Sequence, residues 1–272
     1  MNYRHAYHAG NFADCFKHVL LLWLLRAMGR KDTPFFVLDT HAGVGSYDLT
    51  GPEAVRTGEW TAGIGRLLEA NPPELADYLG LVRELGLYPG SPAIARALLR
   101  PQDRLAVCEL HPQDAALLDR RFGRDGRVQV HRRDGYEAIG ALLPPPEKRA
   151  LVLIDPPYEQ EDEFAAVVRA LELGVSRLRG GVFAAWYPIK HRAPVREFFE
   201  QLKLSGIKDI LAAEIFLREP VDPARLNGCG LLLVNPPYKA EEDWDVLLEV
   251  LVDVLGNREF GEGTALVRVA DE

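Results

Sequence analysis

The chain has 272 residues, of which 47% are hydrophobic and 26% are charged, and these values are typical of a globular protein with one large domain. Its longest early apolar run, 19–25, is too short to span a membrane and is followed by no signal-peptide cleavage site. Three scattered cysteines form neither a disulfide framework nor a metal knuckle, so we expect a cytoplasmic protein.

The formal net charge of −8 argues against a general affinity for nucleic acid, because phosphate contacts need basic groups. Basic side chains nevertheless gather at 4–18, 131–133 and 190–192, whereas acidic side chains gather at 241–253. A surface polarised in this way can bind RNA on one side. Any single cluster is more often an ordinary solvated face.

The first predicted element is a helix that begins after Asn11, a good capping residue, and runs to about Gly29. Apolar residues lie on nearly every side of this helix, so we expect it to be buried. Strand-like runs then alternate with helical patterns, which predicts an α/β fold with a mostly parallel, seven-stranded sheet. The strands are expected at 35–38, 105–108, 128–130, 150–154, 181–186, 209–216 and 230–234, with an added edge strand at 265–269.

An unusually long segment separates the first two strands. It contains helical patterns at 61–70 and 74–85, which are separated by Asn71-Pro72-Pro73. A simple crossover needs only one helix. We therefore expect residues 49–88 to form a small helical subdomain inserted after the first strand of a single domain, 1–272.

The most informative motif is Asp155-Pro156-Pro157-Tyr158, which directly follows the apolar strand 150–154. The prolines end the strand, and Tyr158 offers a ring face at its carboxyl end, where open α/β sheets bind ligands. Acceptors beside a stacking ring suit a flat base that carries an exocyclic amine. The pattern resembles the D-P-P-Y motif of amino methyltransferases that use S-adenosylmethionine.

Acidic residues close the first four strands in chain order, as Asp39, Glu109, Asp134 and Asp155. Each of them alone is more often a helix cap or a surface ion pair. Together, their order is that of a class I methyltransferase. Glu109 is then expected to accept ribose hydroxyls, and Asp134 with Gly135 to bind an adenine edge.

The loop after the first strand is a candidate cofactor cradle, because Gly43 and Gly45 permit close backbone approach. A dinucleotide-binding fingerprint would need a third glycine where Asp48 stands, which disfavours a dehydrogenase.

Two histidines are candidate donors to the carboxylate of the cofactor, namely His18 on the buried helix and His41 in the loop. Histidines bonded to backbone groups in the core are a common alternative. No carboxylate or cysteine spacing supports a metal site made of His5, His8 and His18, so no metal is expected.

A second motif, Asn235-Pro236-Pro237-Tyr238, follows the strand 230–234. Only Asp155 comes one strand after Asp134, where the methyltransferase order requires it. The second motif is therefore interpreted as a structural strand stop.

Several segments together resemble the family of ribosomal RNA large subunit methyltransferase J, over nearly the full length of the chain. The resemblance implies N6-methylation of one adenine of 23S rRNA by means of S-adenosylmethionine. Phe12 departs from the family pattern, which has a histidine at this position. The segments are Tyr3-Arg4-His5, His8 to Asn11 with Asp14, 38–43, 89–92, 109–112, Asp134-Gly135, 155–158 and 186–188.

The resemblance also implies residue roles, with Asp155 as the catalytic acceptor and Tyr3 as a contact to the RNA. Pro156 and Tyr158 are expected to hold the target base, and 23S rRNA is the expected partner of a monomeric protein that needs no membrane. Two alternatives stay open: a DNA adenine-N6 methyltransferase, and a non-catalytic RNA-binding module on the same scaffold. The residues implied to hold S-adenosylmethionine are His18, His41, Ser91, Glu109, Asp134, Gly135 and Asp155.

Overall fold

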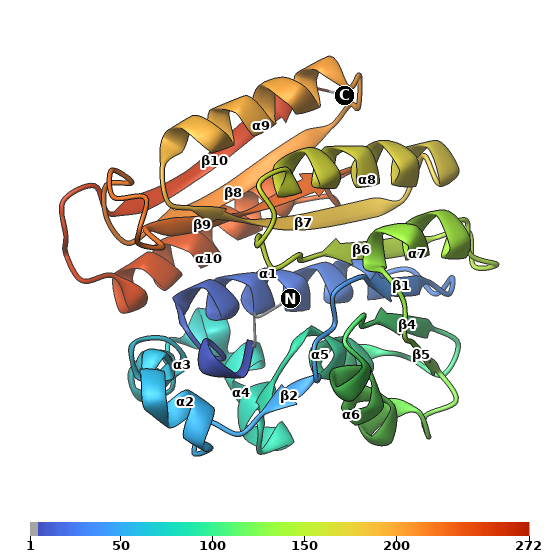
Figure 1. The fold of residues 1–272 in the computed structure, drawn as a ribbon, viewed down its shortest axis with the longest axis horizontal. Coiled ribbons are helices and arrows are strands. Elements are labelled where there is room, and N and C mark those ends of the chain that lie inside the picture. Colours follow the sequence, from blue (N-terminus) through green and yellow to red (C-terminus); the bar gives the residue numbers. More distant parts are fainter. Residues whose placement is uncertain (1–4, 272) are drawn as a thin grey trace.

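A computed structural model describes residues 5–271, and its centre is an eight-stranded sheet (Figure 1). The strand order is β10-β8-β9-β7-β6-β1-β4-β5. A separate pair is formed by β2 (Ser46–Tyr47) and β3 (Tyr88–Pro89). The strands of the main sheet are β1 (Phe36–Asp39), β4 (Arg104–Cys108), β5 (Val128–His131), β6 (Ala150–Ile154), β7 (Val182–Ile189), β8 (Ile210–Phe216), β9 (Gly228–Val234) and β10 (Gly263–Ala270).

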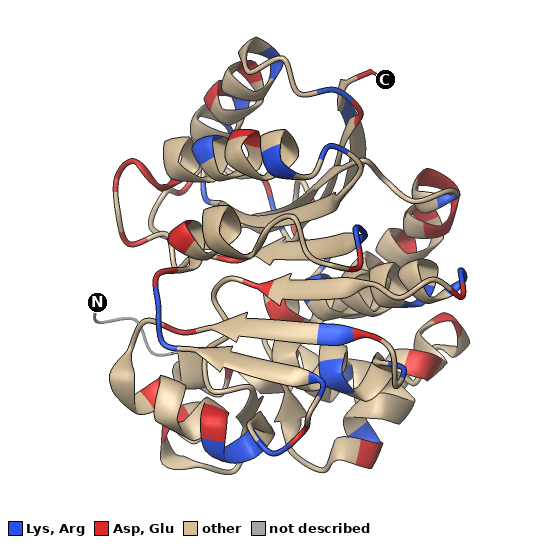
Figure 2. Cartoon of the chain, turned by 90° about the vertical axis from the view of Figure 1, so that its right-hand side faces the viewer, with Lys and Arg blue, Asp and Glu red and all other residues tan. Residues whose placement is uncertain are grey.

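Five neighbouring strands, from β5 to β7, run parallel. β9 is antiparallel to both β7 and β8, and β10 is antiparallel to β8. The parallel strands and β8 therefore end at the same edge of the sheet, and their arrowheads point to one side in Figure 2. The predicted α/β fold with a mostly parallel seven-stranded sheet is confirmed, and β10 adds the expected edge strand.

Helices cover both faces of the sheet (Figure 1). One hydrophobic cluster includes α1, α5 and α10, and the other includes α7, α8 and α9. Successive strand residues contribute to opposite clusters, as the two-residue period of a strand requires. The helices are α1 (Phe12–Gly29), α2 (Pro52–Thr57), α3 (Ile64–Ala70), α4 (Ala76–Leu85), α5 (Ser91–Leu98), α6 (Pro112–Phe122), α7 (Gly135–Leu142), α8 (Glu163–Arg177), α9 (Arg192–Leu204) and α10 (Ala240–Leu255), with short 3-10 helices η1 (His5–Tyr7), η2 (Glu59–Ala62) and η3 (Pro73–Leu75).

The first long helix forms as the sequence predicts. The Asn11 side chain accepts a hydrogen bond from the Asp14 amide and caps α1, whose residues are mostly buried. Within residues 5–271, no helix is both long enough and apolar enough to cross a membrane.

Between β1 and β4 the structure is richer than the two expected helices. The short helix α2 and the strand pair β2–β3 were missed, because six- and two-residue elements are too short to show a periodic pattern. The helices α3 and α4 lie within the predicted patterns. The division of the chain into a single domain with 49–88 as an insertion stays a prediction.

β7 is longer than the predicted 181–186 and continues through Pro188 to Ile189. Pairing with β6 stops at Ala185, whereas pairing with β9 continues to Ile189. A proline is tolerated here because this part of β7 has no neighbour on its β6 side.

Candidate active site

One cavity of about 850 Å³ opens at the edge where the parallel strands end. Tyr3 lies outside the described residues, so its expected RNA contact stays a prediction. All other predicted site residues line this cavity: His18, His41, Ser91, Glu109, Asp134, Gly135, Asp155, Pro156 and Tyr158.

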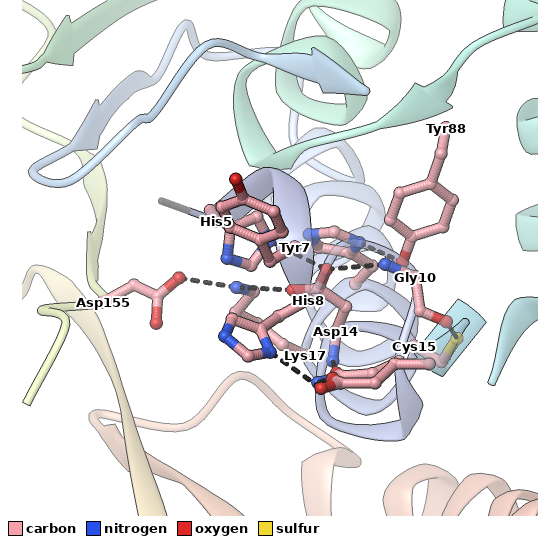
Figure 3. Close-up of polar contacts among 12 residues, drawn as sticks. His5, Tyr7, His8, Gly10, Asp14, Cys15, Lys17, Tyr88 and Asp155 are labelled. Atoms are coloured by element: carbon pink, nitrogen blue, oxygen red, sulfur yellow. Dashed lines mark hydrogen bonds and ion pairs between the residues drawn. The ribbon is translucent and has the colours of Figure 1, made fainter. Parts of the chain in front are cut away.

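Asp155 is held by an ion pair that sequence reasoning missed (Figure 3). The Lys17 ammonium lies 2.6 Å from Asp155 Oδ2 and 3.1 Å from Asp14 Oδ1. Asp155 Oδ1 has no hydrogen-bond partner among residues 5–271. The available signal was a lysine in the middle of an apolar helix, since a buried ammonium requires a counter-charge.

Asp14 connects Lys17 to the N-terminal segment. Its Oδ2 accepts hydrogen bonds from His5 Nε2 at 2.8 Å and from the Gly10 amide at 3.0 Å. Burial alone would raise the pKa of Asp14, but the charges of His5 and Lys17 hold it well below the usual range. Asp14 is therefore ionised and fixes the Lys17 ammonium from the side opposite Asp155.

His18 projects from α1 toward Tyr88, whose hydroxyl lies 3.0 Å from His18 Nδ1 and 3.2 Å from the Tyr78 hydroxyl. Burial lowers the pKa of His18 to about 3, so the imidazole is neutral at pH 7. Nε2 makes no hydrogen bond within the described part of the chain. It is the ring atom that can meet a ligand.

His41 has a tautomer that its neighbours determine. The Thr40 hydroxyl donates to the Leu153 carbonyl, so it must accept the hydrogen bond from His41 Nδ1 at 2.7 Å. Burial lowers the pKa of His41 to about 4. Its Nε2 is then an acceptor rather than the donor expected from the sequence, which suits the ammonium of a bound amino acid better than the carboxylate.

Asp39 lies beneath the cavity and is buried. Burial raises its pKa to about 7, with a further contribution from the Asp155 charge and opposition from the Ser91 hydroxyl. Its Oδ2 has no hydrogen-bond partner among the described residues. Ser91, at the first position of α5, thus connects Asp39 to the cavity that it lines.

Glu109 directly follows β4, and its carboxylate is oriented by two backbone amides. The Gly43 amide donates to Oε2 at 3.0 Å and the His111 amide donates to Oε1 at 2.7 Å. Burial raises the pKa of Glu109, and these two bonds oppose the rise. Each oxygen keeps a lone pair that can accept a further hydrogen bond at the cavity that Glu109 lines.

Asp134 has the capping role that was weighed as its alternative, and it still lines the cavity. Its Oδ1 accepts from the Tyr136 and Glu137 amides and caps α7, while Oδ2 has no partner within residues 5–271. Gly135 permits a close approach, since a Cβ there would lie 2.0 Å from the Thr40 carbonyl oxygen. The glycine therefore keeps the end of β1 against the start of α7.

Tyr158 is fixed in a strained conformation beside Pro156. Its φ of 51° lies in the left-handed region, which costs a non-glycine residue roughly 1–2 kcal/mol. The hydroxyl donates to the Trp186 carbonyl at 2.9 Å, and the ring meets Phe164 edge-on at 5.0 Å. The ring is thus positioned before any base arrives.

The second motif lies at the opposite edge of the sheet, because β9 runs antiparallel to β7. The Asn235 side chain donates to the carbonyls of Arg179 and Gly181, and its amide donates to the Asp209 carbonyl. Tyr238 is 82% exposed. The structure agrees with the interpretation of this motif as a strand stop.

Two elements between β1 and β4, η2 and α3, hold the N-terminal segment over the cavity. Glu59 lies 2.9 Å from His8 Nδ1 and accepts from Asn11 Nδ2 at 3.0 Å. The Ile64 amide donates to the Gly10 carbonyl at 2.8 Å. The segment that carries Asp14 is therefore held between the sheet and the elements η2 and α3.

The strand order and the four acids at consecutive strand ends define the class I methyltransferase fold. Comparison with known proteins identifies the family within this class. A family described as "Ribosomal RNA large subunit methyltransferase D, RlmJ" matches residues 32–267. The chain belongs to this family of ribosomal RNA large subunit methyltransferases.

Individual relatives agree over nearly the whole chain. The ribosomal RNA large subunit methyltransferase J of Escherichia coli (strain K12) is 40% identical over 256 residues, covering 91% of each chain. The Haemophilus influenzae protein of the same name is 40% identical over 264 residues, covering 94% of each. A Legionella pneumophila crystal structure has a TM-score of 0.87 and 34% identity, and the match covers 96% of this chain and 98% of that one.

Proposed function

We propose that this protein transfers a methyl group from S-adenosylmethionine to the exocyclic N6 of a specific adenine in 23S rRNA. The proposal is carried by Asp155 Oδ1, which has no hydrogen-bond partner among residues 5–271 and lies beside Tyr158, in the same cavity as the acids that follow β4 and β5. The names of the relatives support ribosomal RNA as the substrate.

The cavity fits the cofactor in volume and in chemistry. A volume of about 850 Å³ lies in the range of sites that enclose small molecules. Glu109 would accept the ribose hydroxyls, Asp134 Oδ2 the adenine amine, and His18, His41 and Ser91 would contact the amino-acid part. Bound S-adenosylmethionine supplies an electrophilic methyl group.

The residues around Asp155 can prepare the target amine. The lone pair of adenine N6 is delocalised into the ring, so the nitrogen is a poor nucleophile. Asp155 Oδ1 and the Pro156 carbonyl would accept hydrogen bonds from the two N–H groups of this amine. Lys17 keeps the carboxylate oriented through Oδ2. Stacking of the base on Tyr158 would contribute about 1–3 kcal/mol.

Proton transfer is not demanding in this arrangement. The amine becomes acidic once methylation makes it cationic, and Asp155 then accepts the proton. Much of the rate is expected to come from positioning. The adenine must be unpaired or flipped out of a helix to enter the cavity.

The test is methyl transfer by Asp155→Ala from labelled cofactor to 23S rRNA. We expect transfer to be abolished, because the acceptor for the amine is lost, while the melting temperature stays close to that of the wild type. Asn235→Ala at the opposite edge is the matched control and should keep its activity. Transfer at the wild-type rate by Asp155→Ala would contradict the assignment.

Two further comparisons separate the alternatives. Naked 23S rRNA and duplex DNA, offered in parallel as acceptors, distinguish an RNA from a DNA methyltransferase. A non-catalytic RNA-binding module predicts no heat of binding when the cofactor is titrated in a calorimeter.

For Tyr3→Ala we expect impaired methylation with cofactor affinity nearly unchanged.

A further inference from the structure

We propose that the RNA strand next to the target adenine is bound at a basic rim, defined as Lys190 with Ala224, Arg225 and Leu226. In this arrangement Lys190 and Arg225 contact backbone phosphates. The inference rests on the proposed function and deepens it by assigning the surface that binds RNA.

The charge of the cavity lining limits where phosphates can approach. Among the described residues, Lys17 and Lys190 are the only lysines or arginines in the lining, and Lys17 is already paired with Asp14 and Asp155. The carboxylates of the lining repel the phosphates of RNA, whereas Lys190 is exposed and attracts them. The carboxylates of the lining are Asp14, Glu59, Glu109, Asp114, Asp134, Asp155, Glu159 and Glu163.

The rim is a single built surface rather than two loops that happen to be close. The buried Asn227 donates from Nδ2 to the carbonyls of Lys190 and Asp222, both at 2.7 Å, and from its amide to Ile189. Asp222 in turn accepts from the Ala224 amide at 2.9 Å, and its carbonyl accepts from the Arg225 amide. Asn227 thus fixes the turn after β7 against the loop that joins β8 to β9.

The rim lies on the side of the cavity where the target base is expected. Lys190, Ala224 and Leu226 line the cavity together with Trp186, whose carbonyl accepts from Tyr158. Glu109 and Asp134, by contrast, follow β4 and β5 on the other side of β6. A strand whose base stacks on Tyr158 therefore emerges beside Lys190.

Lys190 and Arg225 are the basic groups of this region that can contact phosphates, since Arg192 and Arg218 are engaged in ion pairs. Arg192 lies 3.7 Å from Glu219, and Arg218 lies 2.9 Å from Glu259. Lys190 and Arg225 are exposed, and neither has a carboxylate within 4 Å among residues 5–271, although the charge of Arg225 also lowers the pKa of Glu259. The exposed segment 159–162, which lies outside the basic rim, is acidic and repels phosphates.

The experiment measures the dissociation constant of a 23S rRNA fragment that the wild type methylates, from 50 to 200 mM salt, for Lys190→Ala and Arg225→Ala. Each variant should bind about fivefold more weakly at 0.1 M salt, with a log–log salt slope smaller by about 0.7, the value for one lost single-strand phosphate contact. The turnover number at saturating RNA and the affinity for S-adenosylmethionine should not change.

Lys208→Ala and Arg179→Ala are matched controls, since these exposed residues precede β8 and β7 at the opposite edge of the sheet. Lys190→Arg should keep wild-type binding. Unchanged affinity and slope in both rim variants, or an equal loss in the controls, would overturn the rim while the wild type still methylates RNA. A wild type that methylates no rRNA fragment would instead overturn the proposed function, and the inference with it.

Discussion

At the scale of single residues, the environment of Asp155 depends on a group outside its own motif. The Lys17 ammonium stands between Asp14 and Asp155, and the side chains of Lys17 and Asp155 are 7% and 15% exposed. Removing the lysine would leave Asp155 without its cationic partner in a poorly hydrated site, while Asp14 would keep only its contacts with His5 and the Gly10 amide. Lys17 is therefore the expected positioning residue for Asp155, the proposed catalytic acceptor.

Replacing Lys17 by methionine tests this role. We expect the turnover number to fall by about 100-fold, because loss of the ion pair lets the acceptor leave its productive position. Lys203→Met, which breaks only an exposed pair with Glu200, should leave turnover unchanged. Single-turnover methylation of 23S rRNA measures both, and equal rates for Lys17→Met and the wild type would exclude the positioning role.

The raised pKa of Asp39 predicts a pH dependence of stability. Its pKa is about 7 in the folded protein and about 3.9 in an unfolded chain, so the native state binds more protons between these values. The contribution of Asp39 to the free energy of unfolding therefore falls as pH rises through this range, by at most about 1.4 kcal/mol per pH unit.

Urea unfolding at pH 5 and pH 7 measures that contribution. The Asp39→Asn variant should lack this pH-dependent contribution, so the difference in unfolding free energy between the wild type and the variant changes with pH. His18 and His41, with folded pKa values of about 3 and about 4, titrate between pH 5 and pH 7 only in the unfolded chain, so their contribution cancels in the comparison. A difference that does not change with pH would show that Asp39 is ionised in the fold.

The sequence identifies the acids of the site well, because each lies directly after a predicted strand or, for Asp134, within four residues of its end. It does not identify partners that depend on three-dimensional contacts. Lys17 meets Asp155 across 138 positions of sequence, and the tautomer of His41 depends on the Leu153 carbonyl. No local pattern encodes such contacts.

At the scale of elements, η2 and α3 are in direct contact with the N-terminal segment. Gly63 makes their close approach possible, since a Cβ there would lie 2.1 Å from the Gly10 carbonyl oxygen. The Gly10 amide also donates to Asp14, which contacts Lys17. Gly63 is thus connected to Asp155 through the backbone of Gly10 and the side chains of Asp14 and Lys17.

Gly63→Ala should separate these segments. We expect a loss of about 1–3 kcal/mol of unfolding free energy from overpacking, with a lower turnover number. Gly80→Ala is the control, because a Cβ on this exposed position of α4 meets nothing within 4 Å and alanine favours helix by up to about 1 kcal/mol. Comparable stability and activity of the two variants would refute the coupling.

Long elements were predicted better than short ones. The capped helix α1 and the strands of the sheet followed from apolar periodicity and capping. The pair β2–β3 escaped because its four residues join segments that are more than 40 positions apart. The continuation of β7 through Pro188 depends on where β6 ends, which is a property of the assembled sheet.

At the scale of the whole molecule, two nearly identical motifs lie at opposite edges of one sheet. The direction of the preceding strand decides their roles, since β6 is parallel to its neighbours and β9 is not. Asp155 therefore meets the cavity, whereas Asn235 bonds to carbonyls that precede β7. Chain order alone was enough to predict this difference.

Asn235→Ala is expected to cost about 1–3 kcal/mol of unfolding free energy, because it leaves two carbonyls without their donors. The φ of 55° at this position adds strain for alanine. Methylation by the folded fraction should equal that of the wild type in an assay below the melting temperature. Lost cofactor binding in this variant would instead place the second motif in the active site.

The central claim is that this protein methylates N6 of one adenine in 23S rRNA through Asp155. It is tested most directly by mapping N6-methyladenine in rRNA from cells that lack the protein and from the same cells supplied with the wild type or with Asp155→Ala. We predict that one methylated adenine disappears without the protein, returns with the wild type and stays absent with the variant. An identical methylation map in all three strains would contradict the claim.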